Sequence, residues 1–355
     1  MQTISKKIIQ PTIFLAQENC LSLQKNNSME FRTPIKGFDS KFKIGNRDKL
    51  FFIGSCFTEN IGLKLQNLKF ETLVNPFGII YNPISILQSL EKTFNKHQYI
   101  EKDLFENHNI WHSFDFHSRF SDPNKENCLK KMNSSIATAS EFLSKTNVLF
   151  VTFGSAHTYN LLNENKIVSN CHKLPASRFG KKIFDFDSTV KNFETLFSQF
   201  NYANSDLKIV LTVSPIRYLS DGFVENQKSK ALLILLCHAL AEKFPFVDYY
   251  PAYEIMMDDL RDYRFYNADM IHPNNQAIDY IFSHFSKTFF CDESQRMMTD
   301  ISEINKALEH KTFFNDSENY KKHCGKMIEK IERVKLKYPF VNFSDEIDYF
   351  KETLE

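Results

Sequence analysis

Short, mostly hydrophobic runs alternate along this chain with longer segments of helical periodicity. The runs lie at 50–53, 70–74, 147–153, 207–213 and 246–250. Runs of this length that end at Gly, Ser or Pro are typical of strands buried on both faces. The segments with helical spacing lie at 58–68, 84–95, 124–145, 185–202, 225–243, 253–262 and 275–289. Strands that alternate with helices predict βαβ units, and therefore an α/β fold with a mostly parallel sheet.

Three regions depart from this alternation. Residues 108–120 predict a small hairpin, which could act as a lid or substrate platform or could simply fill a groove. The stretch around 170–173 reads as irregular. From about 293 the chain is charged helix, and its apolar stripe (Cys324, Met327, Ile328, Ile331 and Val334) either packs on the main domain or binds a partner. We therefore expect a tail at 1–28 that is disordered or a misassigned start, an α/β domain at 29–292 and a helical extension at 293–355.

Composition narrows the class of protein. With 42% hydrophobic and 25% charged residues, the 355-residue chain is ordinary for a globular protein with a sizeable core. The net charge of +1 gives no indication of nucleic acid or an anionic membrane as a partner. Seven Cys without a C-x-x-C pair argue against a disulfide framework or a zinc site, and fit a reducing, cytoplasmic setting. No apolar run approaches the ~20 residues that span a bilayer. The oligomeric state is not fixed by the sequence.

The first candidate for chemistry is the turn where the run at 50–53 meets Gly54 and Ser55. Ser55 would lie between a buried strand and a helix, where the free N–H groups of the helix favour developing negative charge. This makes Ser55 a candidate nucleophile, although a plain strand-closing turn explains the same residues. Cys56 is a competing nucleophile, because a thiol at a helix N-terminus can have a lowered pKa; packing is the simpler role for it. The G-x-S-x-G elbow of α/β-hydrolases is absent.

The second candidate is the loop that opens the helix at 275–289. Asp269 and His272 are spaced so that the carboxylate can accept a hydrogen bond from one imidazole nitrogen, leaving the other free to take a proton. A plain capping loop, with Asn274 as the cap and His272 incidental, is the alternative. Together the two loops supply a nucleophile, an orienting acid and a base in the order Ser, Asp, His.

The segment Gly54-Ser55-Cys56-Phe57-Thr58 resembles the motif that names the GSCFA family, a branch of the SGNH (GDSL-like) hydrolase superfamily. Further matching segments follow in order over roughly residues 30–290. They are Asn75-Pro76-Phe77-Gly78-Ile79, Gly154-Ser155-Ala156, Asn170-Cys171-His172-Lys173, Ser214-Pro215-Ile216-Arg217, Asp221-Gly222, Glu225-Asn226 and Asp269-Met270-Ile271-His272-Pro273. The resemblance implies a three-layer α/β/α flavodoxin-like sheet, and the C-terminal helical extension follows the part of the chain that it covers.

The resemblance also implies roles. Ser55 would be the nucleophile, His272 the base and Asp269 the orienting acid of a catalytic triad. The oxyanion would be held by the N–H groups of Ser55 and Gly78 and, in the superfamily, by a third-block Asn side chain. Here that block reads Gly154-Ser155-Ala156-His157, so Ser155 would donate in place of the Asn. Asn75, Gly154, His157 and Arg217 are further candidates to line the oxyanion or substrate site.

These roles predict an esterase or lipase-type hydrolase of the SGNH class, acting on a small-molecule or glycan ester, with the ester borne by a carbohydrate or a lipid. The chemistry needs neither a metal nor a cofactor. Two alternatives use the same residues. One is a catalytically weak glycan- or metabolite-binding protein, which the missing third-block Asn favours, because loss of one oxyanion donor typically costs ~2.7–4 kcal/mol of transition-state stabilisation. The other is an acyltransferase.

Overall fold

The architecture was analysed in a computed structural model, which describes residues 32–35, 38–164, 166–309, 318–352 and 354. The predicted tail at 1–28 lies outside the described residues. The strands are β1 (Leu50–Gly54), β2 (Thr72–Val74), β3 (Phe105–Asn107), β4 (Ile110–His112), β5 (Val148–Phe153), β6 (His157–Leu161), β7 (Lys166–Val168), β8 (Phe179–Ile183), β9 (Lys208–Val213) and β10 (Val247–Tyr250). The helices are α2 (Cys56–Asn67), α3 (Pro83–Phe94), α4 (Lys125–Leu143), α5 (Phe186–Ala203), α6 (Gly222–Lys243), α7 (Ala252–Glu254), α8 (Asn275–Phe289), α9 (Asp292–Glu309), α10 (Glu318–Lys337) and α11 (Ser344–Glu352).

The predicted α/β fold is confirmed, with a parallel five-stranded sheet at its centre. The strands follow the spatial order β2-β1-β5-β9-β10, and every neighbouring pair is parallel. In order along the chain this is 2-1-3-4-5, the doubly wound flavodoxin-like order. The direction of winding reverses between β1 and β5. In folds of this kind, ligands bind at the carboxyl ends of the strands beside that reversal.

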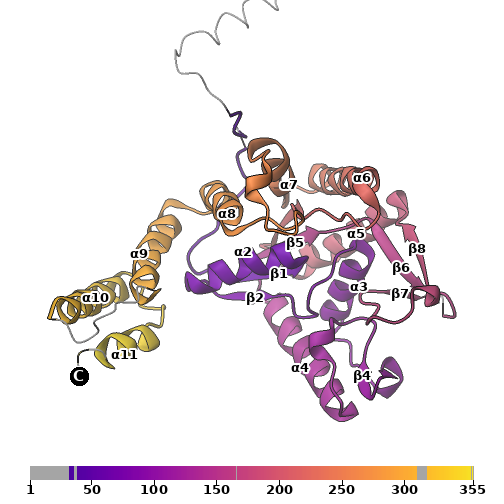
Figure 1. Cartoon of the computed structure of the whole chain (residues 1–355), viewed down its shortest axis with the longest axis horizontal. Coiled ribbons are helices and arrows are strands. Elements are labelled where there is room, and N and C mark those ends of the chain that lie inside the picture. Colours follow the sequence, from indigo (N-terminus) through magenta and orange to yellow (C-terminus); the bar gives the residue numbers. More distant parts are fainter. Residues whose placement is uncertain (1–31, 36–37, 165, 310–317, 353, 355) are drawn as a thin grey trace, which may run out of the picture.

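Helices cover both faces of this sheet, which makes the three layers (Figure 1). The reason lies in the alternation along β1: Leu50 and Phe52 pack with α2 and α8, whereas Phe51 and Ile53 pack with α3, α4, α5 and α6. Because both faces are covered, the central strands β1, β5 and β9 are mostly hydrophobic.

The region at 157–183 is more regular than the sequence indicated. It forms an antiparallel three-stranded sheet, β7-β6-β8, on either side of the stretch around 170–173, which is irregular as expected. Its strands mix Lys, Asn, Thr and Gly with single apolar residues, so no hydrophobic run in the sequence predicts them. The small hairpin expected at 108–120 is present, but it lies slightly earlier, as β3 paired with β4.

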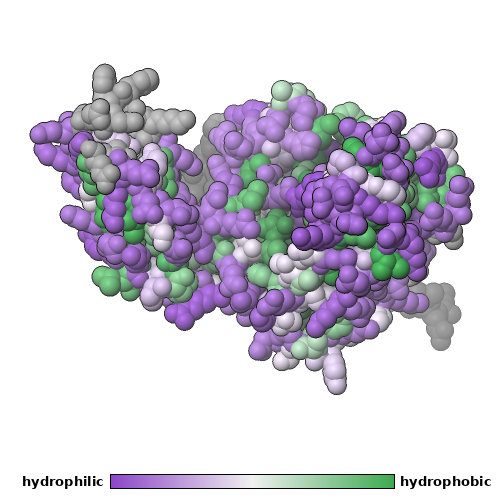
Figure 2. Space-filling view, turned by 90° about the horizontal axis from the view of Figure 1, so that it is seen from below, coloured by the Kyte–Doolittle hydropathy of each residue, from purple (hydrophilic) through white to green (hydrophobic). Residues whose placement is uncertain are grey.

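The C-terminal helices form a lobe beside the main body (Figure 2). The apolar stripe of α10 packs into the same hydrophobic cluster as α2 and α8, and Cys324, Ile331 and Val334 are buried there. At the junction, the Lys69 ammonium lies 2.5 Å from a carboxylate oxygen of Glu346. The described helices include none that combines the length and the apolar character of a bilayer span.

Helix α8 is held on the sheet by Phe285, and this contact can be tested. The buried Phe285 ring packs edge-on against Phe150 of β5 and Tyr250 of β10, with centroids 5.5 and 5.3 Å away. We expect Phe285→Ala to lower the free energy of unfolding by about 3–5 kcal/mol, because it leaves a cavity between helix and sheet. The control is Tyr202→Ala in α5, whose side chain is 95% exposed. Urea denaturation of both variants checks this; equal losses would contradict the role given to Phe285.

Candidate active site

Ser55 lies at the reversal point of the sheet, directly after β1 and at the N-cap of α2. The residue is 1% exposed, its side chain makes no capping hydrogen bond, and Oγ has no partner among the described residues. Gly54 before it has φ +144, and a Cβ there would lie 2.2 Å from the Thr152 carbonyl oxygen of β5. Only glycine allows β1 and β5 to approach this closely, so Gly54 fixes the place of the hydroxyl.

Asn75 brings a second unpartnered polar atom to the same edge. It follows β2 with φ +46, and its Oδ1 accepts a hydrogen bond of 2.8 Å from the Gly54 N–H. Its Nδ2 is buried and has no partner in the described part of the chain. An unsatisfied buried group typically costs about 1–3 kcal/mol, so two of them beside one turn require an explanation.

Asp269 and His272 form the pair that their spacing predicts. His272 Nδ1 lies 2.7 Å from Asp269 Oδ2, while Asp269 Oδ1 accepts the N–H groups of Ile271 and His272. The backbone hydrogen bonds from His272 and Ile271, followed by the side-chain bond, lower the pKa of Asp269 to about 2. Asn274 also caps α8 by accepting the Ala277 N–H. The loop therefore contains both the Asp269–His272 pair and the Asn274 cap.

Helices α2 and α8 place Ser55 and His272 at the same edge of the sheet. The two helices are in contact: Lys64 of α2 pairs with Asp279 of α8 at 2.5 Å. Just beyond their C-terminal ends, the rings of Phe70 and Phe290 meet with centroids 5.1 Å apart. The helices therefore run side by side in the same direction (Figure 1). Ser55 precedes Lys64 by nine residues and His272 precedes Asp279 by seven, so the two candidates lie at similar heights.

The link between the two loops is not made in this structure. Ser55 Oγ has no hydrogen-bond partner in the described residues, and so it is not bonded to His272. Arg217 instead holds the His272 loop from the neighbouring strand end after β9. Its N–H donates to the Ile271 carbonyl at 3.2 Å, and its guanidinium donates to the Met270 carbonyl.

Three backbone donors at this edge, the N–H groups of Gly78, Gly154 and Ser155, already have acceptors. The Gly78 N–H donates to the Asn75 carbonyl at 2.8 Å. The N–H groups of Gly154 and Ser155 both donate to the Tyr81 carbonyl, at 2.7 and 3.1 Å. The Ser155 hydroxyl accepts the His157 N–H and lies 3.3 Å from His157 Nδ1. Two side-chain donors expected here, Asn75 Nδ2 and Arg217 Nε, are buried without an acceptor in the described chain.

The local chemistry favours Ser55 over Cys56 as nucleophile. Burial raises the pKa of the Cys56 thiol, so the thiolate is disfavoured. The Cys56 thiol also lies close enough to the Tyr81 side chain for the two to affect each other's pKa. His172, in the matching segment 170–173, is a buried structural group: Nε2 lies 2.7 Å from the Ser113 carbonyl oxygen, and burial lowers its pKa to about 4.

Lys230 is the group that the sequence reasoning missed. It is fully buried in α6, and its Nζ donates to the carbonyls of Gly154 and Ser214 at 2.8 Å each. It thereby ties the carboxyl end of β5 to that of β9. Burial lowers its pKa to about 7. The signal in the sequence was a lysine next to the almost wholly apolar run from Ala231 to Leu236.

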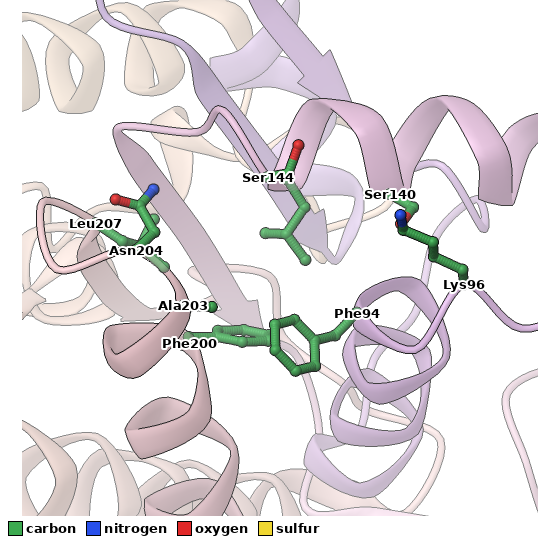
Figure 3. Close-up of a pocket in the computed structure, with 9 residues that line it drawn as sticks. Phe94, Lys96, Ser140, Ser144, Phe200, Ala203, Asn204 and Leu207 are labelled. Carbon is green, nitrogen blue, oxygen red and sulfur yellow. The ribbon is translucent and has the colours of Figure 1, made fainter.

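A cavity of about 200 Å³ lies at the opposite edge of the sheet (Figure 3). It is lined near the C-terminal ends of α3, α4 and α5, where the rings of Phe94 and Phe200 lie 5.2 Å apart. Asn204 and Ser144 at its rim bond to backbone carbonyls. None of its lining residues is among the predicted site residues, which gather at the carboxyl edge.

Comparison with known proteins gives a family. The model of the GSCFA family matches residues 49–285, and that of the GSCFA domain protein, C-terminal domain, matches residues 301–355. No curated protein matches. One solved structure that is similar is the crystal structure of a carbohydrate esterase family 3 from Talaromyces cellulolyticus, with 8% identity and a TM-score of 0.33, over 72% of this chain and 99% of that one. Because the family match spans more than half of the sequence, the chain belongs to the GSCFA family.

Proposed function

We propose that this protein is a serine esterase of the SGNH type, with Ser55 as nucleophile, His272 as base and Asp269 as orienting acid. The observation that carries the proposal is the buried, unpartnered Ser55 Oγ at the reversal point of the sheet. A hydroxyl that costs folding energy and makes no bond there is explained by a role in chemistry. The Asp269–His272 pair at the same edge supplies the acid–base function.

The reaction would proceed through an acyl-enzyme. Asp269 Oδ2 holds Nδ1–H of His272, which leaves Nε2 free to take the proton of Ser55. Ser55 Oγ attacks the ester carbonyl, and the imidazolium returns the proton to the departing alkoxide oxygen. Water then attacks the acyl-enzyme with His272 again as base, releasing the carboxylic acid and restoring Ser55. The Asn75 Nδ2–H group would donate to the oxyanion, the role that a third-block Asn fills in the superfamily.

Two rearrangements accompany this mechanism. Ser55 is 1% exposed, so an ester reaches Oγ only after the groups that cover it move. His272 must also come within hydrogen-bond distance of Ser55. Catalytic hydrogen bonds that are long in a ligand-free enzyme commonly tighten in the substrate complex. The His272 side chain is 44% exposed and free of dense packing, which favours such a shift.

As the substrate we propose an ester of a carbohydrate or lipid. We also propose that the chain has three parts: a tail at 1–28, an α/β domain at 29–292 and a helical extension at 293–355. The second candidate is a binding protein with little or no turnover. It is favoured by the N–H groups of Gly78, Gly154 and Ser155, which already have acceptors. A panel of short p-nitrophenyl esters separates the two, because a binding protein turns over none of them.

The nucleophile can be tested by paired substitutions at neighbouring positions. We expect Ser55→Ala to lower kcat for p-nitrophenyl acetate by at least about 10³-fold, since no other hydroxyl takes its place. Cys56→Ala should retain activity, because the thiol is protonated and lies beside Tyr81. Activity that survives Ser55→Ala and disappears in Cys56→Ala would move the nucleophile to the thiol.

The oxyanion donor can be tested without removing the contact that orders the turn. Asn75→Asp keeps an oxygen to accept the Gly54 N–H but replaces the Nδ2 donor by a negative charge. We expect kcat to fall by about 10²–10³-fold with a far smaller change in KM. Asn82→Asp is the matched control, since Asn82 Oδ1 caps α3 at Ser85. Steady-state kinetics of both variants decide, and equal kcat values would exclude Asn75 as the donor.

A further inference from the structure

Arg217 is a buried cation set among aromatic rings beside the His272 loop. The residue is 7% exposed, in the loop after β9. Its guanidinium carbon lies 4.3 Å from the ring centroid of Tyr266, 5.3 Å from that of Tyr263 and 5.8 Å from that of Phe223. Rings at these distances stabilise a cation but leave its hydrogen-bond donors unused.

The charge of Arg217 has no anionic partner in the described residues. No carboxylate lies within 4.0 Å of its guanidinium there, and the acceptor that it does reach is the Met270 carbonyl oxygen. Its Nε is buried without a hydrogen-bond partner. A guanidinium carries five N–H donors in a planar fork, so most of its capacity for an anion is unfilled.

A cavity of about 170 Å³ adjoins this side chain. Arg217 lines it together with Arg261, Asp262, Tyr263, Tyr266 and two methionines. Asp262 does not neutralise Arg217, because its carboxylate accepts the Arg264 N–H at 2.9 Å and faces the Arg264 side chain. Arg261 is paired with Asp258 at 3.8 Å, with its side chain 80% exposed. The cavity is therefore lined by two arginines, two tyrosines and two methionines, and its one carboxylate, Asp262, is paired with Arg264.

We propose that this cavity is an anion subsite that takes a carboxylate carried by the ester substrate. A planar carboxylate matches the fork of Arg217, and the tyrosine rings would contact the chain that joins it to the ester. Arg217 is hydrogen-bonded to Met270 and Ile271, so the subsite lies next to His272. The inference rests on the proposed esterase activity and narrows its substrates to acidic esters.

The kinetic test compares two esters of similar length, p-nitrophenyl hemisuccinate with a carboxylate and p-nitrophenyl butyrate without one. We expect Arg217→Met to lower the ratio of their kcat/KM values by about 10- to 100-fold, the range for a hydrogen bond to a charged group. The ratio cancels any common loss from a displaced His272 loop. Arg261→Met, an exposed substitution that leaves folding intact, should lower the ratio less. Arg178→Met, an exposed arginine of another region, should leave it unchanged.

A binding measurement separates the subsite from the esterase activity. Titration calorimetry of Ser55→Ala with monomethyl succinate should detect binding that neutral methyl butyrate lacks and that Arg217→Met or Arg261→Met weakens. Ester turnover without charge preference, with equal binding of both probes, would overturn the subsite and leave the esterase. Arg217-dependent binding of monomethyl succinate by a protein that hydrolyses no ester would keep the subsite and overturn the esterase.

Discussion

The close approach of β1 to β5 at Gly54 sets the position of the groups proposed for chemistry. The Thr152 carbonyl oxygen lies only 2.2 Å from where a Cβ at position 54 would be, so this approach requires glycine, and the chain turns there into α2 with Ser55 at the reversal point of the sheet. Gly54 donates its N–H to Asn75 Oδ1, which orients the Asn75 amide. A side chain at position 54 would separate the strands and displace both polar atoms. One glycine therefore couples the geometry of the sheet to that of the site.

Much of the fold could be predicted because its signals are local. The apolar run of β1 ends at a glycine, and Asn274 begins α8 as an ordinary cap, so both elements follow from a few adjacent residues. The β7-β6-β8 sheet could not be predicted in this way. Its strands, such as Phe179–Ile183 with Gly180 and two lysines, gain their stability from pairing with one another and not from burial of a continuous run.

In the candidate site, too, contacts between residues close in sequence could be predicted, and contacts between distant residues could not. The Asp269–His272 bond joins residues three apart, and spacing alone predicted it. The N–H groups of Gly154 and Ser155 donate to the carbonyl of Tyr81, more than 70 positions earlier in the chain. No pattern in the sequence reveals these hydrogen bonds. Likewise, Lys230 and Arg217 could be noticed as charged residues near apolar or loop segments. Their partners, however, are backbone carbonyls and rings that only the folded chain brings together.

Tyr81 contacts both the strand end that holds Gly154 and Ser155 and the turn that holds Ser55. Its carbonyl accepts the N–H groups of Gly154 and Ser155, and its side chain lies beside that of Cys56, the residue after Ser55. Movement of this one residue away from the strand ends would free two backbone donors near Ser55. A substrate that displaced Tyr81 would free two N–H donors for the oxyanion, in addition to the Nδ2–H of Asn75. These donors would offset part of the transition-state stabilisation that is lost because the third block here lacks the Asn of the superfamily. If Tyr81 stays in place, Asn75 is the main side-chain donor to the oxyanion. A binding protein without turnover is then favoured over an esterase.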